Sequence, residues 1–145
     1  MDPRLSLVTL GVRDLDAARA FYADGLGWTP LLDVAGEVLF FQVGPGLVLG
    51  LYTGLEGDVG DGVALAAPGT APLTLSHNVG TDDEVRRLTD RAEAAGATVL
   101  KAPQRADFGG FHSYVADPAG FRWEICHNPG LVVGEDGTVT LGPVD

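Results

Sequence analysis

The sequence predicts an α+β protein built from two βαβββ modules in one domain. Strand-like and helix-like segments follow one another in that order twice along the chain. Val12 and Val79, which precede the two predicted helices, and Gly27 and Gly96, which follow them, place the copies 67 to 69 residues apart. The length of 145 residues, with 46% hydrophobic and 20% charged residues, suits one globular domain. We therefore divide the chain into module one (4–54), a connector (54–72), module two (73–128) and a tail (129–145).

The first module begins with a Leu- and Val-rich, partly alternating segment that predicts a strand over 5–12. Asp14 can cap the helix that follows, and Gly25 or Gly27 would end that helix. Gly-Pro-Gly around Pro45 predicts a hairpin turn. The other expected strands are 28–34, 37–43 and 47–53. The connector is rich in glycine and acidic residues, which is typical of a loop, although 63–67 could form a short strand or a lid.

The second module repeats this order. A strand is expected over 73–79, and Thr81 with Glu84 three residues later forms a capping-box pattern. Gly96 would end that helix. The turn 117–120 predicts a hairpin. The strands expected after the helix are 97–101, 110–116 and 121–127, and a weaker hairpin is expected in the tail at 131–133 and 139–141.

The register of the last hairpin decides which side chains share a face of the sheet. Pairing Ala116 with Phe121 would set Ser113 opposite Glu124, because side chains alternate between faces along a strand. One face would then carry Phe111, Ser113, Val115, Arg122, Glu124 and Cys126, and the other would carry His112, Tyr114, Trp123 and His127.

Two sets of segments resemble a known family. The first lies at the start of module one and the second at the end of module two, where Asp-Pro-x-Gly-x-x-Trp-Glu is the most specific run. They resemble the vicinal-oxygen-chelate superfamily, which includes glyoxalase I, bleomycin-resistance proteins and extradiol dioxygenases. The resemblance spans residues 5 to 128. It is carried by 8–15, 20–22 and 25–28, and by 94–97, 108–110 and 117–124.

The resemblance implies an incomplete eight-stranded barrel around a cavity, a small-molecule ligand and, often, a homodimer. It also implies a divalent metal held by residues of the first and last strand of each module. At those four positions this chain has Leu7, Gly50, Thr74 and Glu124, of which only the last is a good ligand.

We therefore expect no metal and no other cofactor, with a divalent metal as the alternative. Glu124, His77 and His112 are the reserve ligands. His77 shares its face with the residues expected to pack under the helix, which favours a core histidine with a hydrogen-bonded ring over a metal ligand. His112 would come beside Glu124 only if the register shifted by one residue.

The function we expect is metal-free binding of a small molecule, as in drug or metabolite sequestration, without catalysis. The expected ligand-binding residues are Asn78, Phe111, Ser113, Arg122, Glu124 and Trp28. Two alternatives stay open: a metal-dependent lyase, isomerase or dioxygenase, and a metal-free enzyme with Glu124 as catalytic base. Glu124 could also only pair with Arg122. Cys126 could be a nucleophile, but no neighbour would activate it, which favours an apolar filler.

Charge and cysteine content narrow the partners and the compartment. The net charge of −11 disfavours nucleic acid and anionic membranes, and it favours a cationic ligand or only keeps the protein soluble. Aromatic residues on or beside the predicted strands could stack on an aromatic ligand. No apolar run approaches the ~18 residues of a membrane span, and the first residues lack a signal-peptide pattern. The single cysteine agrees with a reducing compartment. We therefore expect a cytoplasmic protein.

Overall fold

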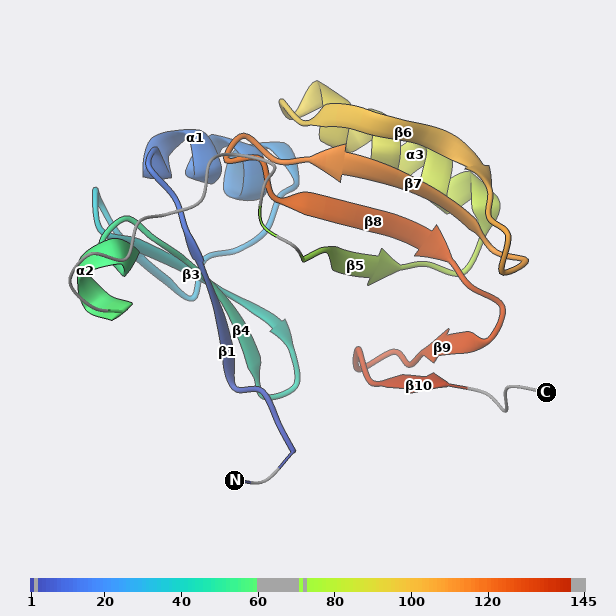
Figure 1. The fold of residues 1–145 in the computed structure, drawn as a ribbon, viewed down its shortest axis with the longest axis horizontal. Coiled ribbons are helices and arrows are strands. Elements are labelled where there is room, and N and C mark those ends of the chain that lie inside the picture. Colours follow the sequence, from blue (N-terminus) through green and yellow to red (C-terminus); the bar gives the residue numbers. More distant parts are fainter. Residues whose placement is uncertain (2, 60–70, 72, 142–145) are drawn as a thin grey trace.

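The two-module α+β architecture is confirmed by a computed structural model, which describes residues 1, 3–59, 71 and 73–141. Each module contributes one four-stranded mixed sheet with a helical layer on one face (Figure 1). The two sheets are separate and do not close into a barrel. The expected strand or lid at 63–67 lies outside the described residues. No helix in the described part of the chain is long and apolar enough to cross a membrane.

Module one has the strand order β1-β4-β3-β2, with β1 parallel to β4 and the other pairs antiparallel. The turn between β3 and β4 is possible because Gly46 adopts a positive φ of 72°. Leu10, Leu39 and Leu51 point from this sheet into the core beneath the first helix. The strands are β1 (Leu7–Gly11), β2 (Leu32–Val34), β3 (Val38–Gly44) and β4 (Leu47–Tyr52).

The helical layer of module one starts as expected and then changes its geometry. The Ala17 backbone N–H donates to Asp14 Oδ1 at 2.9 Å, which confirms the predicted cap of α1 (Leu15–Arg19). The helix continues as a π-helix, η1 (Ala20–Gly25), and the chain then turns at Gly27 with a φ of 77°. A Cβ at Gly25 would lie 2.4 Å from the Ala95 Cβ, so this helix end approaches module two closely.

The strand expected over 28–34 begins only at Leu32. The Trp28 backbone N–H instead donates to the Tyr22 carbonyl at 3.0 Å, which ties this segment to the π-helix. A short helix that the sequence did not predict, α2 (Leu55–Val59), opens the connector.

Module two repeats the plan with the strand order β5-β8-β7-β6 and with β5 parallel to β8. The predicted capping box of its helix is confirmed, because the Glu84 N–H donates to Thr81 Oγ1 at 3.2 Å and the Gly80 N–H donates to Glu84 Oε2 at 3.0 Å. The elements are β5 (Leu75–Asn78), α3 (Asp82–Ala94), β6 (Thr98–Arg105), β7 (Phe111–Ala116) and β8 (Arg122–His127), followed by the expected tail hairpin of β9 (Leu131–Val133) and β10 (Val139–Leu141).

The register of the β7–β8 hairpin differs by one residue from the prediction. Ala116 pairs with Arg122, not with Phe121. The Asp117 side chain causes this shift, because its Oδ1 accepts the backbone N–H groups of Ala119 at 3.0 Å and Phe121 at 2.8 Å. Phe121 is thereby held inside the turn, and every residue of β7 meets a different partner on β8.

The same aspartate joins the two modules. The Tyr22 hydroxyl of the π-helix donates to Asp117 Oδ2 at 2.5 Å, and Trp123 Nε1 donates to the Tyr22 oxygen at 2.9 Å. Tyr22 is fully buried and Asp117 is 5% exposed. Burial raises the pKa of both groups. Partners 95 residues apart in sequence are thus connected through a buried polar network.

Candidate functional site

Strand alternation gathers a polar cluster on the face of module two's sheet that points away from α3. Tyr114 on β7 lies opposite Glu124 on β8, and β5 runs beside β8 with Ser76 paired to Glu124. We call this surface the Glu124 face; its members are Ser76, Asn78, His112, Tyr114, Glu124 and Cys126. Arg122, two residues before Glu124 on β8, belongs to the same face by alternation.

The Glu124 carboxylate is the centre of this cluster. Its Oε1 lies 2.9 Å from His112 Nδ1 and accepts the Tyr114 hydroxyl at 3.2 Å. Its Oε2 accepts the Ser76 hydroxyl at 3.2 Å, and Asn78 Nδ2 donates in turn to the Ser76 oxygen at 3.3 Å. Glu124 keeps 20% of its side chain exposed. One partly accessible carboxylate is therefore fixed by three side chains from two neighbouring strands.

His112 is the most buried polar member of the cluster. Its side chain is 9% exposed, and Nε2 has no hydrogen-bond partner among the described residues. The rings of Phe108 and Tyr114 meet the imidazole edge to face, with centroids at 5.7 and 5.4 Å. An ionised Glu124 accepts from Nδ1–H, so this arrangement leaves the basic lone pair of a neutral ring on Nε2.

Two other groups of the Glu124 face stay protonated at neutral pH. Burial, followed by the nearby Glu124 charge, raises the pKa of the Cys126 thiol to about 11. The same two causes raise the pKa of the Tyr114 hydroxyl. Cys126 is consequently a buried thiol, which supports its interpretation as a filler, and Tyr114 is a hydrogen-bond donor.

Phe111 and Ser113 do not lie beside Glu124, so the prediction that they share its face of the sheet is wrong. Because the register is shifted, both point under α3. The Ser113 hydroxyl lies 2.6 Å from the Thr89 hydroxyl, and the Arg86 guanidinium stacks 4.4 Å from the centroid of the Phe111 ring. Ser113 is fully buried. These two residues hold the helix on the sheet.

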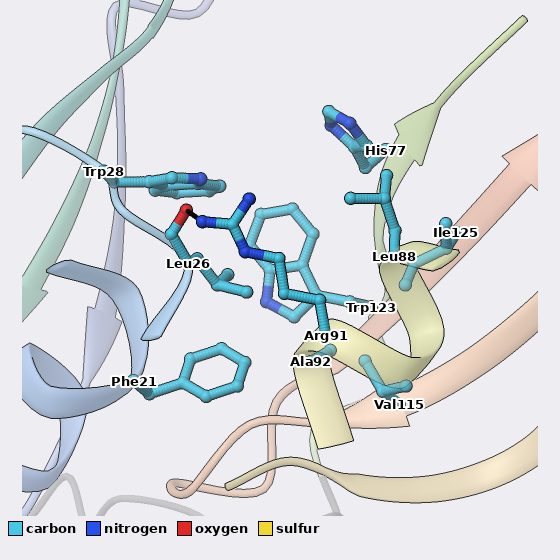
Figure 2. Close-up of a pocket in the computed structure, with 10 residues that line it drawn as sticks. All are labelled: Phe21, Leu26, Trp28, His77, Leu88, Arg91, Ala92, Val115, Trp123 and Ile125. Atoms are coloured by element: carbon cyan, nitrogen blue, oxygen red, sulfur yellow. Dashed lines mark hydrogen bonds between the residues drawn. The ribbon is translucent and has the colours of Figure 1, made fainter. Parts of the chain in front are cut away.

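Trp28 and His77 lie together at a different place. They line a pocket between the modules on the helix side of the sheet, with Arg91 at its mouth and Trp123 in its wall (Figure 2). Trp28 meets Trp123 edge to face, with ring centroids 5.8 Å apart. His77 therefore faces the helix side, as strand alternation predicts, and it is separated from Glu124 by the sheet.

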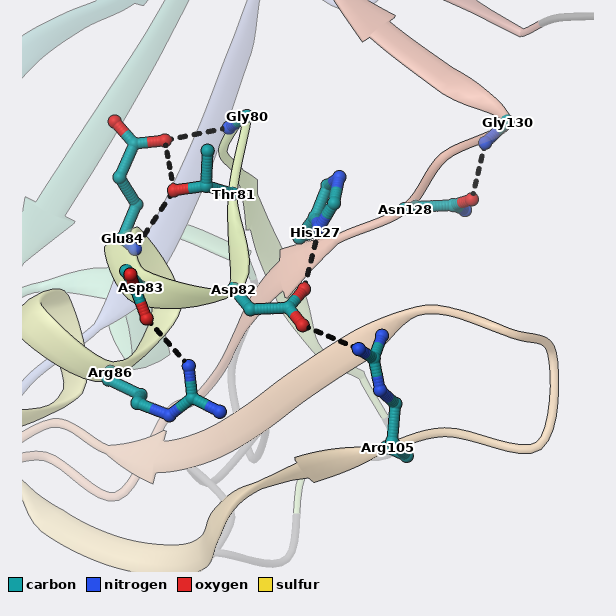
Figure 3. Close-up of polar contacts among 10 residues, drawn as sticks. All are labelled: Gly80, Thr81, Asp82, Asp83, Glu84, Arg86, Arg105, His127, Asn128 and Gly130. Carbon is teal, nitrogen blue, oxygen red and sulfur yellow. Dashed lines mark hydrogen bonds and ion pairs between the residues drawn. The ribbon is translucent and has the colours of Figure 1, made fainter.

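A third cluster, which no sequence pattern predicts, lies at the start of α3. Asp82 Oδ1 lies 2.7 Å from His127 Nδ1, and Asp82 Oδ2 lies 2.9 Å from Arg105 Nη2 (Figure 3). The hydrogen bond to His127, and then the Arg105 charge, hold the pKa of Asp82 below its usual value. The cluster ties the ends of β6 and β8 to the helix, so we assign it a structural role.

The residues at the expected metal positions do not fit a metal. Leu7 and Gly50 have no side-chain ligand atom and Thr74 is a poor ligand for a divalent ion, so Glu124 is the only good ligand of the four. A Cβ at Gly50 would lie 2.8 Å from the Phe40 ring, so the aromatic ring occupies the place a ligand would need. The described residues also contain no group of three or more His, Cys, Asp or Glu side chains that could hold an ion.

Comparison with known proteins agrees with this fold. A glyoxalase-related enzyme from Fulvimarina pelagi is 38% identical, with 97% of this chain and 99% of that chain covered and a TM-score of 0.88. Lactoylglutathione lyase from Agrobacterium tumefaciens is 26% identical over 88% of this chain and 95% of its own, with a TM-score of 0.63. A glyoxalase/bleomycin resistance protein/dioxygenase from Nocardioides shares the fold at 24% identity, with 91% of each chain covered and a TM-score of 0.71.

Curated protein sequences gave no significant match. The family model of the glyoxalase group, in contrast, matches residues 4–125, which cover module one and nearly all of module two, Glu124 included. The chain belongs to the Glyoxalase/Bleomycin resistance protein/Dioxygenase superfamily.

Proposed function

We propose that this protein binds a small molecule on the Glu124 face without a metal, as a sequestering member of its superfamily. The observation that carries the proposal is the fixed, partly exposed Glu124 carboxylate, whose partners are hydrogen-bond donors. A carboxylate in an acidic protein attracts cations, and the neighbouring Tyr114 and His112 rings favour a flat ligand. We therefore propose a cationic or aromatic ligand.

Asn78 and Arg122 are two further polar residues of this site. Asn78 reaches Glu124 through Ser76, so a ligand that displaces the Ser76 hydroxyl would gain the amide as a second contact. Arg122 precedes Glu124 by two residues on the same strand, which places it on the same face by strand alternation. Both residues are thus retained as ligand-binding candidates.

Calorimetric titration of cationic compounds that carry aromatic rings, with bleomycin as the first compound, tests the proposal. Glu124→Gln removes one negative charge and should weaken binding by about tenfold or more, because a partly buried charge contact is lost. The matched control is Glu93→Gln on the exposed side of α3, which should leave affinity within about twofold. Equal losses in both variants would contradict a binding site at Glu124. A reaction product in the mixture would contradict sequestration without catalysis.

A specific observation supports a second candidate, a metal-free enzyme. The Glu124 carboxylate lies against His112 Nδ1 and leaves Nε2 without a partner in the described part of the chain, as in a carboxylate-positioned imidazole base. Nε2 is buried, so this candidate requires a substrate that displaces the side chains covering it. In this candidate the base is His112, and Glu124 is the residue that positions it. Nitrogen NMR of the histidine side chain should then show the Nδ1–H tautomer at neutral pH, and a protonated Nε2 on the neutral ring would exclude this role.

Metal independence has its own measurement. After dialysis against zinc, iron(II), manganese and nickel in turn, mass spectrometry of the untagged protein should find less than about 0.1 equivalent of each, because only one of the four expected ligand positions carries a good ligand. Close to one equivalent of any metal would favour the metal-dependent lyase, isomerase or dioxygenase instead.

We further propose that the protein works as a cytoplasmic homodimer. The two sheets of one chain do not close around a common cavity, so a second copy could complete the enclosure. The single cysteine is a buried thiol, which suits a reducing compartment.

A further inference from the structure

The pocket between the modules is separate from the Glu124 face. Phe21, Leu26 and Trp28 reach it from module one, and His77, Leu88 and Trp123 are among those that reach it from module two (Figure 2). We propose that this pocket is a second binding site, for a neutral single-ring aromatic molecule that carries a hydroxyl group.

Size and lining select the ring. The pocket has a volume of about 150 Å³ and is partly open to solvent, and its walls are mainly aromatic and aliphatic side chains. An apolar cavity of about that volume holds one benzene-sized ring. Trp28 and Trp123 stand nearly perpendicular, at an interplanar angle of 83°, so they offer a face and an edge to the same ring.

The walls are fixed before a ligand arrives. Trp123 is oriented by its hydrogen bond to the buried Tyr22 hydroxyl. Arg91 Nη2 donates to the Leu26 carbonyl at 2.7 Å, which fixes the mouth of the pocket across the two modules. A preformed pocket loses little conformational freedom on binding, which favours affinity for small ligands. The wall from module one includes part of a π-helix, a geometry often found at functional sites.

The charges around the pocket disfavour both kinds of ion. A cation would meet the Arg91 guanidinium. An anion would find that Arg91 Nε and Nη2 already donate to the carbonyls of Gly25 and Leu26. It would also be repelled by the net charge of −11 and by the Glu84 carboxylate, whose charge acts on His77. A neutral ligand avoids both costs.

His77 supplies the polar contact. Neither ring nitrogen bonds to a residue in the described part of the chain, and burial lowers its pKa, which favours the neutral ring. A neutral imidazole has one nitrogen that accepts a hydrogen bond and one that donates. A ligand hydroxyl at the pocket mouth can use either one.

Fluorine NMR with 4-fluorophenol and fluorobenzene tests the site on the intact protein. We expect 4-fluorophenol to bind with a dissociation constant of about 1 mM or lower, within the efficiency of small ligands, and fluorobenzene to bind more weakly. Both tryptophans of the chain line the pocket, so their fluorescence should change along the same titration.

Matched variants locate the binding. Ala92 is buried in the pocket wall and Ala94 is exposed on the same helix. Ala92→Leu should weaken the binding of 4-fluorophenol at least about tenfold, because the larger side chain fills the pocket. Ala94→Leu should leave the affinity within about twofold, because Ala94 lies outside the pocket. His77→Phe should abolish the preference for 4-fluorophenol over fluorobenzene while fluorobenzene still binds.

The outcomes decide the proposal. Absence of binding by the wild-type protein at about 10 mM ligand would overturn it, since a preformed site of this size should be occupied there. Unchanged affinity in Ala92→Leu would also overturn it. If Ala92→Leu does not fold, Leu88→Phe fills the same pocket from the next turn of α3 and must give the same loss. A retained hydroxyl preference in His77→Phe would refute the role of His77.

Discussion

The Glu124 side chain organises the hydrogen bonds of the Glu124 face. Its two oxygens are bound by side chains of Ser76, His112 and Tyr114, so the carboxylate is held in one position and is not free to change rotamer. A fixed charge loses less entropy when a ligand binds. The neighbouring Cys126 is affected by the same carboxylate, which disfavours a second negative charge beside it.

Cys126 should therefore be unreactive in the folded protein. With a pKa of about 11, the thiol is almost fully protonated at pH 8, and the residue is 3% exposed. An aromatic disulfide reagent should label no thiol in native protein within minutes and one thiol after unfolding in guanidinium. Rapid native labelling would contradict the burial of β8.

The Tyr22 hydroxyl should stabilise the protein measurably. Tyr22→Phe removes the donor to Asp117 and the acceptor for Trp123, so we expect the free energy of unfolding to fall by about 1–3 kcal/mol. Tyr52→Phe is the matched control, because the Tyr52 hydroxyl has no hydrogen bond within the described residues; its effect should stay within about 0.5 kcal/mol. Equal effects in urea titration would mean that the network contributes nothing.

At the scale of elements, the contact between the π-helix and α3 depends on Gly25. Gly25→Ala would force a Cβ to within 2.4 Å of the Ala95 Cβ, and overpacking of this kind costs about 1–3 kcal/mol. Gly57→Ala in the short helix α2 meets nothing within 4 Å and should be neutral or slightly stabilising. Thermal unfolding should rank Gly25→Ala below wild type, and the reverse order would exclude close packing here.

The brace at the start of α3 should make stability depend on pH. The folded-state pKa of Asp82 is lowered, so its contribution is present above the unfolded pKa of about 4 and is lost as pH falls through the folded value. Urea unfolding between pH 7 and pH 3 should show a steeper loss of stability in wild type than in Asp82→Asn. Parallel curves would show that the pair with His127 does not persist in solution.

The elements differ in how far the sequence could predict them. The caps at Asp14 and Thr81 are local patterns, and both were predicted correctly. The hairpin register was not, because it depends on which backbone groups the Asp117 side chain accepts, and strand alternation carries no information about that choice. The shift of one residue between the predicted and the observed register places His112 beside Glu124 and turns Ser113 to the opposite face of the sheet.

The helix of module one shows a different limit. Its start and its end near Gly27 follow from the sequence, but its π-helical second half does not, and that half approaches Ala95 at the end of α3, more than fifty residues away in the chain. Trp28 was likewise expected on a strand, because an aromatic residue is typical of strands; its ring instead packs between the modules. Contacts between modules were beyond what periodicity could predict.

At the scale of the whole molecule, the unclosed sheets predict self-association. Light scattering after size-exclusion chromatography should give about 30 kDa, twice the chain mass of 15.1 kDa, at micromolar concentration. A mass of one chain at all concentrations would contradict the homodimer, and the Glu124 face would then have to bind its ligand with a single chain.

The strand order also has a consequence for synthesis of the protein. In each module the first strand pairs with the last, β1 with β4 and β5 with β8, so the opening strand has no neighbour in its sheet until the module's final strand has left the ribosome. The hydrogen bond of Tyr22 forms even later, because its partner Asp117 is synthesised 95 residues after it. A nascent chain that ends after β4 can complete its first sheet, yet it still exposes the aromatic side chains that module two will cover, and it is at this stage that a chaperone would be needed most.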